Sequence, residues 1–306
     1  MKYRAAMDLG GTHCRFYLED LAGICLGEFS GIGCTLNLDG PVRTKEILGA
    51  TILPALAACG LNPEDCEGFV CAASGADTPA LECEYRQILS ELGFPHQNVL
   101  IYNDCAIFLA PCEAPALLIA SGTGSILWAR DEKGGFHRYG GWGHLTSDEG
   151  SAFSLALKAL STVTRHLDGD GQAPMLTQLI AEQSGLRTQN AITKFCYQNI
   201  LEKSKIAAFA PLVFQAAECG EAEALRLLKE AAQALLHGAL VLSMHTGAFP
   251  SIFLWGSLLL KSDLLSNLLK ELLVIHFPGS VVKAPEDTAL CTAIRLARQI
   301  KEAVSK

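Results

Sequence analysis

The sequence predicts an α/β protein built from two copies of one βββαβαβα unit, the second of which carries a long helical insert. Three observations lead to this prediction. Short apolar or alternating segments are interleaved with segments of helical spacing, which is the pattern of α/β folds. The pattern stops at Pro111–Pro115 and then starts again. A glycine-containing turn follows the first apolar strand of each copy, at Gly10–Gly11 and at Gly122–Gly124.

The first copy opens with three segments that form a meander, followed by alternating helices and strands. Pro41 is suited to a first helical turn and Gly60 to the end of a helix, so a long helix is expected between them. The predicted strands are Tyr3–Asp8, Cys14–Leu18, Ile24–Phe29, Gly68–Ala72 and Asn98–Tyr102. The predicted helices are Val42–Cys59, Ala80–Leu92 and Ala106–Ala110.

The second copy repeats this order around a mostly helical stretch from Gly150 to His245, which contains loops near Asp168–Gly171 and Gly220. The predicted strands are Ala116–Ala120, Ile126–Arg130, His137–Tyr139, Ser251–Trp255 and Ser280–Lys283. The predicted closing helices are Ser262–His276 and Glu286–Val304.

The composition favours an ordered protein that binds neither nucleic acid nor membranes. Half of the 306 residues are hydrophobic and 18% are charged, which allows large cores. The net charge of −8 argues against binding to nucleic acid or to an anionic membrane. The uncharged run Ala231–Leu260 is long enough to span a bilayer, but His237, Gly247 and Pro250 interrupt it. We expect a buried helix, a turn and a strand there.

Twelve cysteines are the unusual feature of the composition. No signal-peptide pattern opens the chain, so we expect reduced thiols in the cytoplasm rather than a disulfide framework. The absence of Cys-x-x-Cys and of His-Glu-x-x-His argues against metal or iron–sulfur ligation. Cysteines such as Cys25, Cys59, Cys105 and Cys291 lie in apolar or small-residue runs, where a free cysteine behaves as a small buried hydrophobe.

The two glycine turns are the first candidates for chemistry. Glycines allow the backbone to approach a ligand and to direct N–H groups at phosphate oxygens, and Thr12, Thr123 and Ser125 add hydroxyl groups. Either turn alone could be an ordinary hairpin, but their matched positions favour phosphate binding. Asp8, at the end of the first strand, is placed to hold a hydrated Mg²⁺. P-loop, Rossmann and protein-kinase motifs are absent.

Asp104 is the candidate base. It follows the strand Asn98–Tyr102, and ligands of open α/β sheets bind at the carboxyl ends of strands. A carboxylate there could accept the proton of an attacking hydroxyl. A helix N-cap is the alternative explanation for an aspartate at this point.

The segment Gly140–Ala152 is the densest polar cluster. Asp148 and Glu149 precede a helix, so capping explains one of them. Trp142 stands among glycines and is harder to explain as a core residue, whereas an indole face beside carboxylates suits a sugar ring. His144 alone is more typical of a packed loop.

A second nucleotide-side candidate is Gly256-Ser257, which follows the strand Ser251–Trp255. Such a strand–helix junction can receive an adenine or a ribose, and a simple turn explains it equally well on spacing alone.

These motifs resemble those of the N-acetylglucosamine kinases within the BadF/BadG/BcrA/BcrD ATPase family, part of the actin/hexokinase/Hsp70 superfamily. The likeness covers nearly the whole chain and is strongest at Ser121–Ser125 and Gly140–Ala152. It implies two RNase H-like (actin-like ATPase) lobes, residues 1–114 and 115–285, which close over the sugar. It also implies that the last segment, 286–306, packs back on the first lobe, and it suggests a homodimer.

The resemblance implies roles for individual residues, with Asp104 as the base that activates the sugar 6-hydroxyl and also contacts the sugar. The residues implied to bind ATP and its phosphates are Gly10, Gly11, Thr12, Gly122, Thr123, Gly124, Ala207, Gly256 and Ser257. The other residues implied to contact the sugar are Asn37, Ser74, Ser125, Gly141, Trp142, Gly143 and Asp148.

The sequence departs from the family pattern in two places. Ile126 stands where the eukaryotic kinases have an asparagine that helps to recognise the acetamido group, and this weakens the case for an N-acetylated substrate. Cys291-Thr292-Ala293 stands where the family often has Gly-Gly-Ala, which affects packing on the adenine side.

We therefore expect an ATP- and Mg²⁺-dependent kinase that makes the 6-phosphate of N-acetylglucosamine. Glucosamine, N-acetylmannosamine and N-acetylmuramic acid are the alternative substrates. Two other classes stay open: an iron–sulfur activator ATPase, for which there are twelve cysteines but no matching pattern, and a catalytically silent sugar-binding module. The presence of both turns and of Asp104 argues against the silent module.

Overall fold

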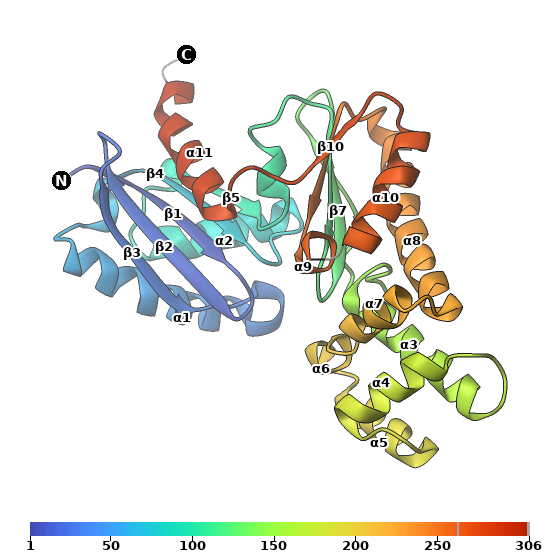
Figure 1. Ribbon diagram of the computed structural model, residues 1–306. Coiled ribbons are helices and arrows are strands. Elements are labelled where there is room, and N and C mark those ends of the chain that lie inside the picture. Colours follow the sequence, from blue (N-terminus) through green and yellow to red (C-terminus); the bar gives the residue numbers. More distant parts are fainter. Residues whose placement is uncertain (262, 305–306) are drawn as a thin grey trace. The chain divides into compact units, whose positions relative to one another are not determined.

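The computed structural model describes residues 1–261 and 263–304, so Ser262, where one predicted helix begins, and residues 305–306 lie outside the described residues. Contacts divide the chain into two units. The first comprises Met1–Cys112 together with Glu286–Lys306, and the second comprises Glu113–Pro285. Each unit contains one five-stranded sheet (Figure 1).

The sheet of the first unit has the order β3-β2-β1-β4-β5. β1, β2 and β3 form an antiparallel meander, while β4 and β5 continue the sheet parallel to β1. Its strands are β1 (Tyr3–Leu9), β2 (His13–Asp20), β3 (Cys25–Ile32), β4 (Cys66–Ala73) and β5 (Val99–Asn103).

The sheet of the second unit has the order β10-β9-β6-β7-β8, which is the same topology. β6, β7 and β8 are antiparallel, and β9 and β10 run parallel to β6. Its strands are β6 (Ala116–Ser121), β7 (Ser125–Arg130), β8 (Phe136–Gly140), β9 (Ser251–Trp255) and β10 (Val281–Lys283). The predicted α/β fold of two like lobes is confirmed.

The helices of the first unit are α1 (Leu36–Ala58), α2 (Pro79–Glu91) and α11 (Ala289–Val304). α1 has a kink at Gly40, whose φ of 73° is not helical, so its regular part begins at Pro41 as expected. In Figure 1, α11 lies on the opposite face of this sheet from α1, and it contacts β1 and β4.

The predicted helix Ala106–Ala110 is wrong. The structure has only a 3₁₀ turn there, η3 (Ala106–Leu109). Pro111 follows Ala110 and has no N–H to donate to the Ile107 carbonyl, which accepts from Ala110 N over 3.1 Å instead, so this segment cannot extend into an α-helix.

The second unit holds the predicted helical insert between β8 and β9. Breaks occur near Asp168–Gly171 and at Gly220, as expected, and further breaks follow α4 and α5. β9 is followed by helices α9 (Ser257–Leu260) and α10 (Asp263–His276), where the sequence predicts one helix from Ser262 to His276. The helices are α3 (Ala152–Leu167), α4 (Pro174–Ser184), α5 (Gln189–Asn199), α6 (Lys203–Ala207), α7 (Ala210–Glu218), α8 (Ala222–Thr246), α9 (Ser257–Leu260) and α10 (Asp263–His276).

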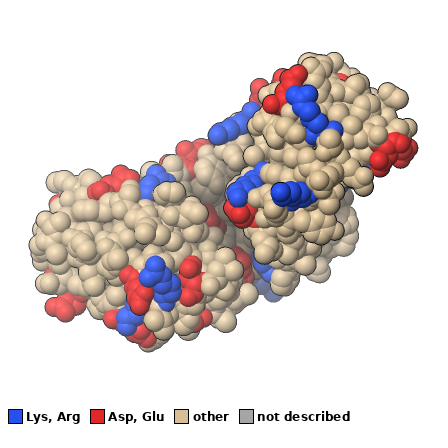
Figure 2. Space-filling view, turned by 90° about the horizontal axis from the view of Figure 1, so that it is seen from below, with Lys and Arg blue, Asp and Glu red and all other residues tan. Residues whose placement is uncertain are grey.

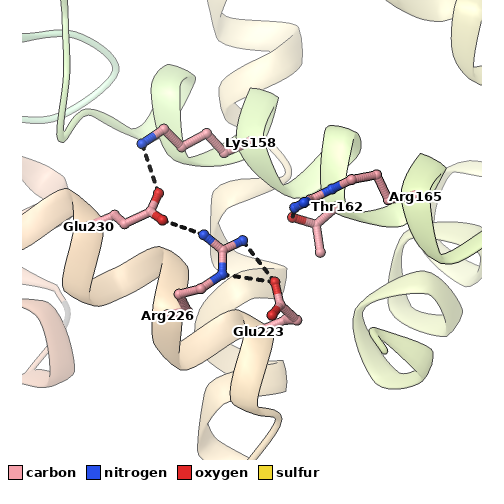
Figure 3. A network of polar contacts seen from close by, with 6 residues as sticks. All are labelled: Lys158, Thr162, Arg165, Glu223, Arg226 and Glu230. Carbon is pink, nitrogen blue, oxygen red and sulfur yellow. Dashed lines mark hydrogen bonds and ion pairs between the residues drawn. The ribbon is translucent and has the colours of Figure 1, made fainter. Parts of the chain in front are cut away.

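A charged network ties α3 to α8 in this unit (Figure 3). Lys158 on α3 donates to Glu230 on α8 over 3.0 Å, and Arg226 bridges Glu230 and Glu223. The uncharged run Ala231–Leu260 divides into the end of α8, strand β9 and helix α9. Within the described residues, no helix is both long and apolar enough to cross a bilayer.

The cysteines are less uniformly buried than the sequence predicts. All twelve are free thiols, and Cys14, Cys34, Cys66 and Cys71 belong to the core of the first unit. The predicted burial of Cys25 and Cys291 is wrong, because both side chains are exposed. Cys25 opens the edge strand β3, half of which faces solvent, and Cys291 lies on the outer side of the amphipathic helix α11.

Charged side chains of both signs are mixed on the surface. In the view of Figure 2, Lys and Arg side chains lie beside Asp and Glu side chains in each unit. Among the described residues on this face, the basic side chains form no continuous patch. This distribution agrees with the acidic net charge of −8.

One ion pair fixes α11 to the sheet of the first unit. Glu19 on β2 is fully buried, and Arg298 on α11 donates to both of its carboxylate oxygens, over 2.8 Å from Nε and 2.6 Å from Nη2. Arg298 itself is half-exposed. A buried carboxylate costs free energy unless it is paired, so this bidentate contact makes the burial of Glu19 tolerable.

We expect Arg298→Ala to lower the free energy of unfolding of the first unit by about 3 kcal/mol, because it leaves the Glu19 carboxylate buried and unpaired. Urea unfolding followed by far-UV circular dichroism measures the loss. All three tryptophans belong to the second unit, so tryptophan fluorescence should report an unchanged transition. Arg43→Ala, which breaks an exposed pair with Glu46, is the control and should cost less than about 0.5 kcal/mol. Equal losses in the two variants would contradict this account.

Candidate active site

The predicted site residues divide between the two units, and each unit gathers its own share. The first unit holds Asp8, Gly10, Gly11, Thr12, Asn37, Ser74 and Asp104. The second holds Gly122, Thr123, Gly124, Ser125, Gly141, Trp142, Gly143, Asp148, Ala207, Gly256 and Ser257.

In the first unit the site residues collect at the carboxyl ends of the parallel strands. Asp8 lies near the end of β1, Ser74 directly follows β4, and Asp104 directly follows β5. β1, β4 and β5 are neighbours in the sheet, so their carboxyl ends share one edge.

The Gly10–Thr12 turn joins β1 to β2, and neighbouring backbone packs closely against it. The Gly10 N–H donates to the His13 carbonyl over 3.0 Å. Gly33, after β3, packs directly on this turn, where an added Cβ would overlap Gly10 O and the backbone nitrogens of Thr12 and His13. Gly11 lies beside Thr35, since an added Cβ would be 3.2 Å from Thr35 Oγ1.

Tyr85 brings the predicted sugar contacts Asn37 and Ser74 together. Its buried hydroxyl accepts a hydrogen bond from Leu36 N and donates one to Ser74 O, each over 2.9 Å. Gly75, with a φ of 79°, lies close to Asn37, because an added Cβ on Gly75 would be 3.7 Å from Asn37 Nδ2. No sequence signal singled out Tyr85, which comes from the middle of α2.

Asp104 does not serve as the helix cap that the sequence allowed. The buried Asn103 performs that role, because its Oδ1 accepts from Cys105 N over 2.8 Å and from Ala106 N over 3.1 Å. Asp104 is therefore available for other chemistry.

The pKa of Asp104 is raised to about 6, chiefly by burial and further by the negative charges of Asp77 and Asp8. Three carboxylates thus converge on this edge of the sheet. A carboxyl group with a pKa near neutrality is suited to general-base catalysis. Sequence reasoning missed Asp77, although its place shortly after β4 was a usable signal. The same surroundings raise the pKa of the neighbouring Cys105 thiol well above its ordinary value.

Asp8 makes an ion pair with Arg15, whose Nη2 lies 2.8 Å from Asp8 Oδ2. Among the described residues, no group of three or more His, Cys, Asp or Glu side chains could form a metal cage. Asp8 by itself suits a cation such as Mg²⁺, which keeps most of its waters and binds through one or two carboxylates and substrate phosphates.

In the second unit the turn Gly122–Gly124 is fused to the segment that precedes α3. Gly122 O and Thr123 O accept from Ala152 N and Phe153 N, the first amides of α3, over 2.9 and 3.2 Å. Ser125 Oγ donates to Glu149 O over 2.8 Å. The turn is therefore hydrogen-bonded to the end of the Gly140–Ala152 segment and to the start of α3.

Within that segment the side chain of Asp148 is buried, whereas the side chain of Trp142 is exposed. Asp148 is buried with a φ of 69°, a strained conformation for a residue other than glycine, and burial raises its pKa. Its carboxylate packs on Gly124, where a Cβ would be 2.6 Å from Oδ2. Trp142 is 73% exposed, with the Arg138 guanidinium carbon 4.4 Å from the centre of its ring. His144 is packed, against Phe153 and 2.9 Å from Ile200 O.

A cavity of about 650 Å³ in the second unit brings together Thr123, Ala207 and Ser257. Phe214 on α7 and Lys261 after α9 also line it. Gly256, directly before Ser257, packs on the end of β6, because an added Cβ would overlap Ser121 O. The contribution of α7 had no sequence signal, since apolar helical spacing does not show which face lines a cavity.

The two sheets of like topology define a fold of the two-lobed, RNase H-like class. The chain belongs to the BadF/BadG/BcrA/BcrD ATPase family, whose model matches residues 5–285.

Curated relatives and solved structures support this placement. The chain is 29% identical over 239 residues to an N-acetylmuramic acid/N-acetylglucosamine kinase of Clostridium acetobutylicum, covering 77% of each chain. It is 25% identical over 261 residues to Glucosamine kinase GspK of Vibrio cholerae, covering 84% of this chain and 85% of that one. The structure is similar to that of a Chromobacterium violaceum protein provisionally named an N-acetylglucosamine kinase, with a TM-score of 0.71, 25% identity and 97% and 99% coverage.

We expect Asp104→Asn to raise the free energy of unfolding at neutral pH. The folded-state pKa of about 6 lies above the ordinary 3.8, so ionised Asp104 destabilises the fold. This cost is absent below about pH 4 and fully present above about pH 6, so the gain should grow across that window. Urea titrations of both proteins from pH 4 to pH 8 measure it. Asp170→Asn, in an exposed loop, is the control. A gain independent of pH would contradict the electrostatic origin.

Proposed function

We propose that this protein is an ATP-dependent amino-sugar kinase that transfers the γ-phosphoryl group to the 6-hydroxyl of N-acetylglucosamine. The observation that carries the proposal is Asp104, a carboxylate with a raised pKa at the carboxyl end of β5 in a chain of this ATPase family. The names of the relatives from C. acetobutylicum and V. cholerae support an amino sugar as the acceptor.

In this proposal Asp104 accepts the proton of the sugar 6-hydroxyl as that oxygen attacks the γ-phosphorus. Asn37 and Ser74, which Tyr85 holds together, position the sugar beside it. The N–H groups of Gly11 and Thr12 bind phosphate oxygens, while the bond from Gly10 N to His13 O shapes the turn and Gly33 holds it in place. Asp8 would hold a Mg²⁺ ion, which when bound would supply positive charge to neutralise the phosphates.

The second unit supplies the nucleotide site in this proposal. The cavity that Thr123, Ala207 and Ser257 line has room for a nucleoside, and the Gly122–Gly124 turn at its edge binds phosphates. The exposed indole of Trp142 offers an apolar surface to one face of the sugar, while Ser125, Gly141, Gly143 and Asp148 contact its polar edge. We further propose that the enzyme is cytoplasmic and forms a homodimer.

Glucosamine is the second candidate substrate, and Ile126 is the observation that favours it. Its side chain packs on Gly141, where an added Cβ would be 2.6 Å from Ile126 Cδ1. An aliphatic group at this place offers no hydrogen bond to an acetamido group. The similarity to Glucosamine kinase GspK agrees with this alternative.

A coupled ADP-release assay over N-acetylglucosamine, glucosamine, N-acetylmannosamine and N-acetylmuramic acid tests the proposal. We expect N-acetylglucosamine to give the highest kcat/KM. Asp104→Asn should lower kcat by about 10²–10⁴-fold, the usual contribution of a general base, and leave the KM for the sugar within about twofold. Asp170→Asn should match the unmodified enzyme. No ADP release with any of the sugars, or near-normal turnover of Asp104→Asn, would refute the assignment.

Ile126→Asn tests the recognition of the acetamido group. An asparagine amide at this place can donate to the acetamido carbonyl, so we expect kcat/KM for N-acetylglucosamine relative to glucosamine to rise about fivefold, as one hydrogen bond contributes roughly 1 kcal/mol. Ile126→Val, which shortens the side chain without adding a polar group, should leave the ratio unchanged. An equal shift in both variants would mean that packing on Gly141, and not hydrogen bonding, sets the preference.

A further inference from the structure

Asn103 lies between two groups that fix the orientation of its side-chain amide. On one side Nδ2 donates to Asp77 Oδ1 over 2.7 Å. On the other side Oδ1 accepts from the backbone N–H groups of Cys105 and Ala106. A carboxylate only accepts and a backbone N–H only donates, so the amide fits in one orientation and not in its flipped form.

This orientation matters because Asp104 lies inside the loop that Asn103 closes. The two N–H groups that Asn103 Oδ1 binds belong to the residues directly after Asp104. The side chain of Asn103 is almost fully buried, with 4% exposed, so it is well confined. The backbone of Asp104 is therefore fixed from both sides by one amide, which Asp77 anchors in turn.

We propose that Asp77 is a positioning residue for the reaction: it anchors the Asn103 amide, which holds the η3 turn and so aims the Asp104 carboxylate. The inference rests on the proposed kinase function and adds a residue to it. Asp77 and Asn103 act through Asp104, and neither is assigned a contact with substrate. A displacement of about 1 Å in a catalytic group can cost about 10²-fold in rate, so a loose amide would reduce turnover more than binding.

The hydrogen bond from Asn103 to Asp77 predicts what happens when the two side chains are exchanged. Asn103→Asp keeps an acceptor for the turn but places a carboxylate against Asp77, and the two like charges repel each other. Adding Asp77→Asn restores a donor opposite an acceptor, with the two residues reversed. Asp77→Asn alone keeps a carbonyl oxygen that can accept from Asn103, whereas Asp77→Ala removes the acceptor.

The test measures kcat and KM for sugar and ATP, with thermal unfolding of each variant. We expect kcat to fall about 10–100-fold in Asp77→Ala and in Asn103→Asp, with both KM values within about twofold. The double variant Asp77→Asn/Asn103→Asp should recover at least tenfold in kcat over Asn103→Asp alone. Thr78→Ala is the control. It removes the N-cap of α2, next to Asp77, and should lower the melting temperature while leaving kcat unchanged.

Two outcomes overturn the inference. The losses in the double variant could be additive, which would mean that Asp77 and Asn103 act independently. Asp77→Ala could also raise KM without changing kcat, which would make Asp77 a binding residue. Both outcomes differ from a failure of the proposed function, in which the unmodified enzyme itself releases no ADP with any of the sugars.

Discussion

The close approach of backbone at two glycines is the constraint on which the candidate site residues of each unit depend. Gly33 packs on the Gly10–Thr12 turn so closely that a Cβ has no room, and Gly256 packs in the same way on Ser121. Each contact joins the first hairpin of a unit to a later strand end of the same unit. The turns that carry the proposed phosphate contacts are therefore fixed by main-chain packing, before any ligand binds.

Fixing the turns in this way allows like charges to be gathered beside them. Asp8, Asp77 and Asp104 come from the ends of three adjacent strands, and their proximity contributes to the raised pKa of Asp104. Such a cluster opposes folding, and the rest of the unit has to offset it. Arg15 binds Asp8, and Asn103 binds Asp77. Among the described residues of this unit, no ion pair includes Asp104, and a carboxylate without a neutralising partner is suited to act as a general base.

The parts of the site that the sequence could predict are those encoded in short segments. The two glycine turns, Asp104 and the exposed Trp142 each carry a local pattern. Tyr85 and Asp77 were missed because their roles arise from contacts with residues far away in the chain. The same holds for the fold. The strands and their order followed from local patterns and duplication, whereas the 3₁₀ turn at Ala106–Leu109 and the exposed cysteines depend on tertiary surroundings.

The two units share one sheet topology but differ in the helices that follow the strands. After β5 the first unit has only the short turn η3, and α11, from the end of the chain, covers β1 and β4 instead. At Gly68 the sheet approaches α11 so closely that a Cβ would overlap Ala297 O, and Glu19 and Arg298 pair nearby. Residues 1–112 therefore cannot bury both faces of their sheet alone. The sheet that carries the candidate site at its carboxyl edge is therefore covered on this face only when α11 has docked on it.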